Sequence, residues 1–195
     1  MKKSRAPAVT QDANRKEAIL TAALTLFSQK GYDGTPVPEI AEAAEVGVGT
    51  IYRYFGDKAD VVNSLYSSWK LRMQKQMLQG LEPTLDHQTG FKLLCRHVLE
   101  FAREHPVAFT FLETHNHQPY LNRSSLKIET TFMDFIQSFV REGQRKKRIR
   151  SVDPDLLIAL VYGALVGVFK LTGGQLSNAQ IESAADSCWE MARKS

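Results

Sequence analysis

Residues 48–58 carry a group of side chains that can bind phosphate oxygens and the edges of bases. Three hydroxyl groups and the ammonium of Lys58 suit phosphate oxygens, and the guanidinium of Arg53 suits a base edge. Lys58 also stands at the start of a predicted helix, where free backbone N–H groups attract anions. Small side chains at the front of the segment would let it approach bases closely. The sequence therefore predicts a surface for double-stranded DNA made of Thr35, Val48, Gly49, Thr50, Tyr52, Arg53, Tyr54 and Lys58.

Two short helices joined by a tight turn are expected to present these side chains. Residues 35–58 read TPVPEIAEAAEVGVGTIYRYFGDK. Thr35 is a suitable N-cap and Pro36 a suitable first residue for one helix, and a second helix is expected over residues 48–55. Apolar residues would lock the two helices together: Ile40, Ala41, Ala44, Val46 and Ile51. This is a helix-turn-helix layout, whose second helix can enter a major groove about 12 Å wide.

The rest of the chain shows the periodicity of helices and no convincing two-residue alternation, so the expected fold is all-α with about nine helices. One helix precedes the helix-turn-helix, and the others follow it, with residues 143–150 as a loop. Their expected ranges are about 13–30, 57–80, a stripe over 91–102, 106–112, 121–141, 154–172 and 178–193. The predicted domains are a DNA-binding domain at 1–56 and a larger helical ligand-sensing and dimerisation bundle at 57–195.

The stretches ILTAALTLFSQKGYDGT (residues 19–35) and IAEAAEVGVGTIYRYFGDK (residues 40–58) resemble the TetR, or tetracycline-repressor-like, family of bacterial transcriptional regulators. The resemblance implies that this part is the DNA-binding domain. It also implies a homodimeric repressor that a small ligand releases from DNA. Residues 60–195 match the family only in size and helix count.

Three positions depart from the family pattern. The turn position usually taken by glycine is Glu45, and a positive φ there would cost on the order of 1 kcal/mol. Gly47 replaces the usual serine cap of the second helix, and glycine is a somewhat weaker cap. Pro38 stands at an often polar position and cannot give a side-chain hydrogen bond to a base. These departures leave fewer side chains to read bases.

The segment Leu156–Phe169 is apolar on all sides, which implies that more than one face of its helix is buried. One face can pack inside the chain, and the other needs a partner chain. Two glycines four residues apart would allow a second helix to approach closely. The predicted homodimer interface comprises Leu157, Val161, Gly163, Ala164, Gly167, Val168 and Trp189.

An apolar ligand pocket is expected between the bundle helices, where aromatic and methionine side chains recur at helical spacing. The same spacing is typical of an ordinary hydrophobic core. The predicted lining is Trp69, Met73, Met77, His97, Phe101, Phe109, His115, Phe132, Phe135 and Tyr162. Methionines suit a flat or flexible apolar molecule. The expected effector is therefore a small apolar or amphipathic molecule.

Two other classes stay open at this point. The chain could be a helical interaction protein without a specific operator, or a metal-responsive regulator that uses Cys95, His97, His115 and His117. Cys-x-His and His-x-His pairs do not share one helical face, so no metal or cofactor site is predicted. The sequence contains no phosphate-binding glycine loop, no metalloprotease motif and no nucleophile elbow, so we do not expect an enzyme.

Composition supports a folded cytoplasmic protein. Among 195 residues, 43% are hydrophobic and 24% charged, so a packed core can form. The longest charge-free run is Leu156–Phe169, shorter than the roughly 18 residues of a membrane span. Two cysteines cannot form a disulfide framework. Basic charge gathers at residues 1–16 and 141–150, either as polyanion contacts or as solvated surface, while the rest of the chain is net acidic.

Overall fold

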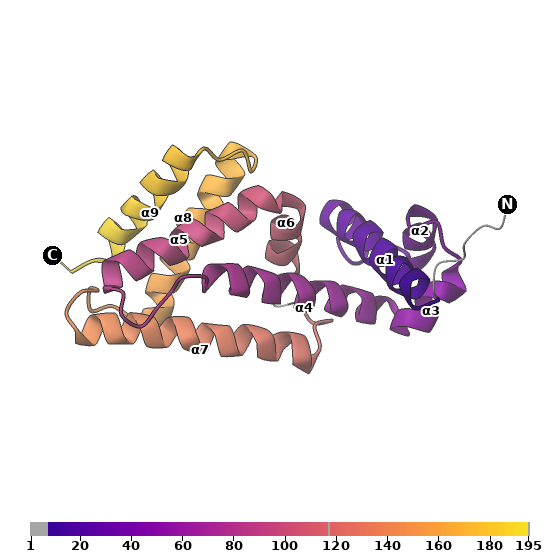
Figure 1. The fold of residues 1–195 in the computed structure, drawn as a ribbon, viewed down its shortest axis with the longest axis horizontal. Coiled ribbons are helices and arrows are strands. Elements are labelled where there is room, and N and C mark those ends of the chain that lie inside the picture. Colours follow the sequence, from indigo (N-terminus) through magenta and orange to yellow (C-terminus); the bar gives the residue numbers. More distant parts are fainter. Residues whose placement is uncertain (1–7, 117, 195) are drawn as a thin grey trace. The chain divides into compact units, whose positions relative to one another are not determined.

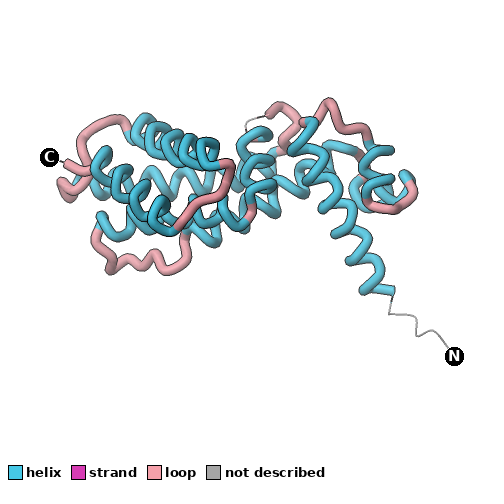
Figure 2. The backbone as a smooth tube through the Cα atoms, turned by 90° about the horizontal axis from the view of Figure 1, so that it is seen from above, coloured by secondary structure: helices cyan, strands magenta, loops and turns pink. Residues whose placement is uncertain are grey.

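The computed structural model describes residues 8–116 and 118–194, and these residues form nine α-helices and no β-strand (Figures 1 and 2). The all-α prediction is confirmed. The helices are α1 Ala8–Lys30, α2 Val37–Ala43, α3 Val48–Phe55, α4 Lys58–Met77, α5 His87–Glu104, α6 Pro106–His115, α7 Arg123–Arg145, α8 Pro154–Thr172 and α9 Asn178–Ala192.

The chain divides into two compact units. The first unit comprises the chain up to Trp69 together with Thr110–Leu126, and the second comprises Lys70–Phe109 together with the chain from Lys127 onward. The first unit thus extends beyond the helix-turn-helix. It includes the first half of α4, most of α6 and the connection to α7 (Figure 1).

Apolar side chains of α1 hold α2 and α3 in the first unit. Ile19, Ala23 and Phe27 recur at steps of four along α1, and all three are fully buried. Ile40 of α2 and Ile51 of α3 are fully buried as well. This shared core fixes α3 by one face and leaves its other face for solvent.

The turns of the helix-turn-helix follow most of the sequence expectations. Gly31 ends α1 with φ 69°, and Glu45 adopts φ 54° at the turn between α2 and α3. The predicted positive φ at Glu45 is therefore present. Thr35 is not the N-cap of α2: Pro36 occupies that position, and the Thr35 hydroxyl donates to the Gly31 carbonyl oxygen at 2.7 Å. That bond closes the α1–α2 turn instead.

Helices α5, α8 and α9 pack together in the second unit. Aromatic edge-to-face contacts join α5 to α9 and α6 to α8, with ring centroids 5.5 Å apart for Phe91 and Trp189 and 4.7 Å for Phe109 and Phe169. Local caps start the helices: Asp86 caps α5, Asp153 caps α8 and Ser177 caps α9.

The basic segment at residues 141–150 begins as helix, contrary to the predicted loop. Helix α7 runs through Gly143 to Arg145. Gly143 is required for packing, because a Cβ atom there would lie 2.5 Å from Ile149 Cδ1. Beyond the helix, Ile149 forms an isolated antiparallel bridge with Arg193. The basic segment is therefore tied to the C-terminal residues.

Candidate nucleic-acid interface

Helix α3 separates its core face from its outer face clearly. Ile51 and Phe55 are buried, whereas Val48 and Tyr52 keep 37% and 49% of their surface exposed. Thr50 is half-buried, and Gly49 and Arg53 are exposed. Gly47 occupies the N-cap and carries no side chain to cap the helix. The first turn of α3 therefore presents small side chains and backbone N–H groups, as a major-groove reading helix does.

The C-terminal part of α3 is bound to α1 by a chain of polar contacts. The Arg53 guanidinium lies 4.8 Å from the centre of the Tyr54 ring and donates to the Tyr54 hydroxyl oxygen at 3.0 Å. The Tyr54 hydroxyl in turn donates to Asp12 Oδ1 at 2.6 Å. Since this hydrogen is already used, Tyr54 does not have it free for a phosphate, in contrast to the sequence prediction.

Lys58 is held at the start of α4 by the α1–α2 turn. Its ammonium donates to the Tyr32 carbonyl oxygen at 2.8 Å and lies 4.2 Å from the centre of the Tyr32 ring. An ammonium has three N–H groups, so further donors remain for an anion. The Asp57 carboxylate accepts from the Asp60 backbone N–H at 2.8 Å and caps the same helix start.

One predicted contributor does not belong to this surface. Thr35 is fully buried, so its side chain does not reach DNA. This part of the prediction is wrong, because the hydroxyl is used inside the turn. The basic residues Lys2, Lys3 and Arg5 of the N-terminal tail lie outside the described residues.

A buried asparagine joins α4 to the connection between α6 and α7. The Asn63 amide nitrogen donates to the Ala59 and Tyr120 carbonyl oxygens, both at 2.8 Å. Its carbonyl oxygen accepts from the Asn122 backbone N–H at 2.8 Å and from the Ser125 hydroxyl at 2.7 Å. All four bonding positions of the amide are occupied. Asn63 therefore fixes this connection against the first half of α4.

His115 joins the end of α6 to the end of α1. It is fully buried, and its Nε2 lies 3.5 Å from the Phe27 carbonyl oxygen while its Nδ1 bonds the Tyr120 hydroxyl. A carbonyl only accepts, so Nε2 carries the hydrogen and Nδ1 accepts from Tyr120. Burial lowers the pKa of His115, and burial with nearby Asp33 and Tyr32 raises the pKa of Tyr120 to about 12. The pair is neutral at pH 7.

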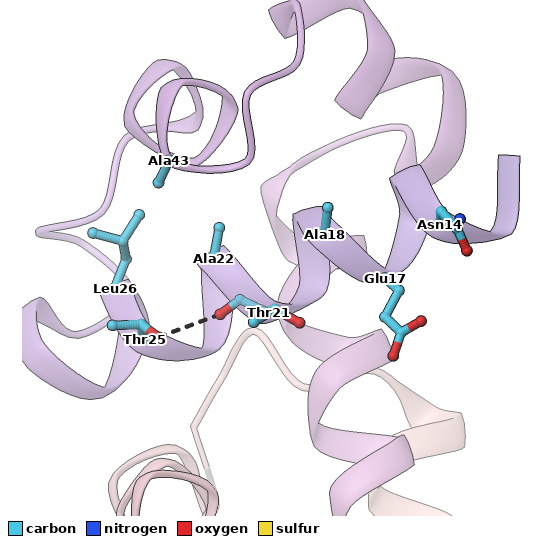
Figure 3. A pocket seen from close by; sticks show the side chains of 8 residues that line it. All are labelled: Asn14, Glu17, Ala18, Thr21, Ala22, Thr25, Leu26 and Ala43. Carbon is cyan, nitrogen blue, oxygen red and sulfur yellow. Dashed lines mark hydrogen bonds between the residues drawn. The ribbon is translucent and has the colours of Figure 1, made fainter. Parts of the chain in front are cut away.

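An open groove of about 650 Å³ runs along α1 beside α2 (Figure 3). Its lining is mostly small or polar: Asn14, Glu17, Ala18, Thr21, Ala22, Thr25, Leu26 and Ala43. Ala43 points from α2 toward the side of α1 that carries Ala22 and Leu26 (Figure 3). None of the residues predicted to contact DNA or ligand lines this groove.

The predicted ligand-pocket residues are divided between the two units. Trp69 and His115 belong to the first unit, and His115 is already bonded there. The others belong to the second unit: Met73, Met77, His97, Phe101, Phe109, Phe132, Phe135 and Tyr162. Within that unit His97 Nδ1 lies 3.2 Å from the Met77 carbonyl oxygen. Met73, Phe101 and Phe109 are buried, whereas Phe132 and Tyr162 are half-buried and Phe135 is 40% exposed.

Helix α8 presents an apolar stripe to solvent. Gly163, Ala164 and Gly167 are exposed and Val168 is half-buried, whereas Leu157, Val161 and Trp189 pack inside the second unit. Those three side chains are therefore not available to a partner chain, in contrast to the prediction. The exposed stripe also includes leucines that the prediction did not name: Leu156, Leu160 and Leu171. A Cβ atom at Gly163 or Gly167 would contact nothing in the chain.

By length and composition α8 could also cross a membrane, the one such helix among residues 8–116 and 118–194. Its mean hydropathy is 1.8, and 22% of the apolar window is buried. The helix has 19 residues, and Asp155 and Lys170 near its two ends confine its charge-free run to Leu156–Phe169. A helix that packs against a partner chain has the same composition, so this finding is weak evidence for a membrane.

The candidate metal ligands are engaged in other contacts. A hydrogen bond with the Cys188 thiol, together with burial, raises the pKa of Cys95. His97 and His115 contact backbone carbonyl oxygens, and His117 lies outside the described residues. In the part of the chain that the structure describes, no three His, Cys, Asp or Glu side chains gather to hold a metal ion.

Two family matches account for nearly the whole described chain. Residues 19–65 match the family described as "Bacterial regulatory proteins, tetR family", and residues 67–194 match the "Tetracyclin repressor-like, C-terminal domain". The chain belongs to the TetR family. TetR-family proteins are transcriptional regulators that bind DNA through the N-terminal helix-turn-helix, so this chain is a DNA-binding regulator.

Individual TetR-family relatives align with this chain over most of their length. The HTH-type transcriptional repressor KstR2 of Mycolicibacterium smegmatis is 25% identical over 78% of this chain and 75% of its own. The fatty acid metabolism regulator protein of Bacillus subtilis is 25% identical over 75% of this chain and 77% of its own. The crystal structure of a TetR-family regulator from Marinobacter aquaeolei superposes with a TM-score of 0.83 at 19% identity, covering 96% of this chain and all of that one.

Several structurally important residues escaped the sequence prediction. Asp12 of α1 contacts Tyr54 of α3, Tyr32 contacts Lys58 and Tyr120, and Asn63 ties Tyr120 to α4. Their partners lie far away along the chain, so no local spacing indicates the contacts. One signal was available: Asn63 interrupts the apolar run of α4 next to Val62, where a polar side chain must find buried partners.

Proposed function

We propose that this protein is a homodimeric repressor that binds a pseudo-palindromic operator in the cytoplasm and is released by a small apolar or amphipathic molecule. The observation that carries the proposal is the outer face of α3. Its first turn exposes Val48, Gly49 and the backbone, with Arg53 exposed further along. A rigid helix with small residues in front and a guanidinium behind suits a major groove.

A relative supports repression rather than activation. KstR2 is named a repressor and aligns with 78% of this chain. A protein that occupies an operator blocks transcription without any further contact, whereas an activator needs a surface for the transcription machinery. Repression is therefore the simpler consequence of operator binding.

The exposed stripe of α8 supports the homodimer. Leu156 and Leu160 are 54% and 44% exposed, and Gly163 and Gly167 follow them on the same side of the helix. Leucine surface released from water contributes about 25 cal/mol per Å². Glycines with open space beside them allow a second α8 helix to approach. A two-fold axis through this contact would place two copies of α3 on related half-sites.

The apolar interior of the second unit supports a hydrophobic effector. Met73 and Met77 lie on one side of α4, and Met77 contacts His97 of α5. Methionine side chains adapt to ligands of different shape, and an imidazole can bind one polar group of an amphipathic molecule. A ligand releases DNA only if it binds the DNA-free arrangement more tightly.

The proposal is tested by selecting the full-length protein against a pool of randomised duplexes. We expect a recovered sequence with two inverted half-sites, centred about 34–36 Å apart or at a multiple of that distance. Recovery of only unrelated duplexes would contradict sequence-specific binding. An asymmetric single site would contradict the dimer and leave the DNA-binding module intact.

The effector is tested by fluorescence of a Trp189→Phe variant, which keeps Trp69 as its only tryptophan. Candidate apolar molecules are titrated with and without the selected duplex. Linkage requires that the duplex weakens ligand binding by the factor by which ligand weakens duplex binding. Equal ligand affinity in both titrations, with release of the duplex, would contradict the proposed mechanism.

A further inference from the structure

Asp12 is an acidic residue of α1 that lies against the DNA-reading helix. Its Oδ1 accepts the Tyr54 hydroxyl at 2.6 Å and lies 3.6 Å from Arg53 Nη2 and 3.9 Å from Arg15 Nη1. A carboxylate repels DNA phosphates, so its presence at this surface needs a reason. DNA binding by the TetR family does not explain this carboxylate, because phosphate oxygens are bound by cations and neutral hydrogen-bond donors.

The direction of the hydrogen bonds supplies the reason. A carboxylate only accepts, so the Tyr54 hydroxyl must point its hydrogen at Asp12. The lone pairs of the hydroxyl oxygen are then directed elsewhere, and Arg53 Nη2 donates to this oxygen at 3.0 Å. The Tyr54 ring supports the same guanidinium from below at 4.8 Å. Asp12 thus fixes Tyr54, and Tyr54 fixes Arg53.

The orientation of Arg53 matters because of its exposure. The Arg53 side chain is 60% exposed, and a free arginine side chain loses much rotamer freedom when it is ordered. Holding the guanidinium in place before DNA arrives removes part of that loss from the binding step. A planar guanidinium reads a guanine edge only in a narrow range of orientations.

We propose that Asp12 is a specificity-determining positioning residue, which acts through Tyr54 to hold the Arg53 guanidinium ready to read a base. The proposal rests on the proposed operator binding. Asp12 has opposite effects on overall DNA affinity and on the preference for operator DNA. Its charge weakens binding to any duplex, while the orientation that it imposes favours the correct base over the others.

Three variants separate charge from positioning. Asp12→Asn removes the charge and keeps an oxygen acceptor for Tyr54, whereas Asp12→Ala removes both. Tyr54→Phe keeps the charge and the ring and removes the hydroxyl. The matched control is Glu17→Gln, which removes one negative charge from α1 in the groove described above. Dissociation constants are measured for the selected duplex and for a random duplex at several salt concentrations.

Loss of charge and loss of positioning should have different effects on DNA binding. Asp12→Asn, Asp12→Ala and Glu17→Gln should each bind the random duplex more tightly than the wild type does. The ratio of specific to random affinity should fall about tenfold in Asp12→Ala and in Tyr54→Phe, the effect of one weakened base contact. It should change less than twofold in Glu17→Gln. Asp12→Ala combined with Tyr54→Phe should lose no more than either alone, since both break one chain of contacts.

A measurement without DNA tests the positioning of Arg53 by Asp12 separately from operator binding. The Arg53 Nε–H signal in ¹⁵N NMR should report a restrained side chain in the wild type and a mobile one in Asp12→Ala. Equal mobility in both would overturn the positioning role, as would an unchanged affinity ratio in Asp12→Ala and Tyr54→Phe. If no duplex is selected over random DNA, operator binding and the specificity role both fail, and the Nε–H signal still decides whether Asp12 restrains Arg53.

Discussion

The contacts inside the first unit differ in kind from the contacts inside the second unit. In the first unit, buried polar side chains add hydrogen bonds to the apolar core: Thr35, Asn63, His115 and Ser125. In the second unit the buried contacts are mainly apolar and aromatic, such as Phe91 on Trp189. Its most enclosed ion pair joins Lys70 of α4 to Glu129 of α7 at 2.5 Å.

This difference bears on what each unit can do. Hydrogen bonds have narrow geometry, so a buried polar network permits one arrangement of the helices that it joins. Apolar packing tolerates changes of volume and shape better. A unit that reads DNA needs fixed spacing, and a unit that accommodates a ligand and a partner chain benefits from adaptable surfaces.

Gly163→Glu should abolish dimerisation through the apolar surface of the second unit. Each copy would bring a carboxylate into a contact between apolar helices, and an unpaired buried charge costs several kcal/mol. Sedimentation at micromolar concentration should then show monomers, and affinity for a two-half-site duplex should fall at least a hundredfold. Thr131→Glu on an exposed position of α7 is the control and should remain dimeric. A dimeric Gly163→Glu protein would contradict the proposed interface.

Asn63→Ala should destabilise the first unit by on the order of 3 kcal/mol. It leaves the Tyr120 carbonyl, the Asn122 N–H and the Ser125 hydroxyl without their buried partner. Urea unfolding measures the change, with the exposed Asn14→Ala as control, which should stay within about 0.5 kcal/mol of wild type. A loss below about 1 kcal/mol would contradict the view that polar contacts fix this unit.

Lys58→Ala should weaken binding to all duplexes alike. Loss of one phosphate contact should lower the slope of log K against log salt by about 0.9. Fluorescence anisotropy at several salt concentrations measures the slope. Lys75→Ala, also on α4 and exposed, is the matched control and should leave it unchanged. An unaltered slope in Lys58→Ala would mean that its ammonium serves only the Tyr32 turn.

His115 should make stability depend on pH. Burial holds its pKa below the usual 6.5, so below pH 6.5 the unfolded chain binds a proton that the folded chain does not. The contribution of neutral His115 to the free energy of unfolding is therefore full above pH 6.5. It declines as the pH falls toward the pKa of His115 in the folded chain, with a slope of at most about 1.4 kcal/mol per pH unit. His115→Gln should reduce this slope in urea unfolding between pH 7 and 5.

Burial also lowers the pKa of His87 and His105 in the second unit. These two histidines also make the free energy of unfolding fall as the pH falls, so some pH dependence should remain in His115→Gln. His105→Gln serves as the comparison and should remove only its own share. A slope identical to wild type in His115→Gln would contradict a neutral, buried His115.

Glu45→Gly should stabilise the protein slightly, by about 0.5–1 kcal/mol. Glu45 has φ 54°, which glycine adopts without a Cβ penalty. Thermal unfolding measures the gain. The matched control is Glu42→Gly inside α2, which should lose about 1 kcal/mol because glycine is a poor helix former. Destabilisation by both changes would show that the Glu45 carboxylate contributes more than its backbone costs.

Local patterns predicted the elements of this fold well. The boundaries of α3 and the caps at Gly31, Asp57 and Gly173 follow from residues within one or two turns. The Thr35 cap was wrong, and the loop predicted at 143–150 begins only after Arg145, since tertiary contacts override local preference at both places. Thr35 donates its hydroxyl to the Gly31 carbonyl oxygen, and the missing side chain at Gly143 lets Ile149 pack against the extended α7.

The sequence by itself determined the helices, the helix-turn-helix and the existence of an apolar surface on α8, because periodicity and capping depend on near neighbours. The tertiary structure alone decided which side chains face each other across long separations in the chain. Asp12 meets Tyr54, Asn63 meets Ser125, and Leu160 rather than Leu157 faces solvent. A hydrogen bond depends on where two groups lie in space, and a helix of uniform apolar composition does not encode which face turns inward.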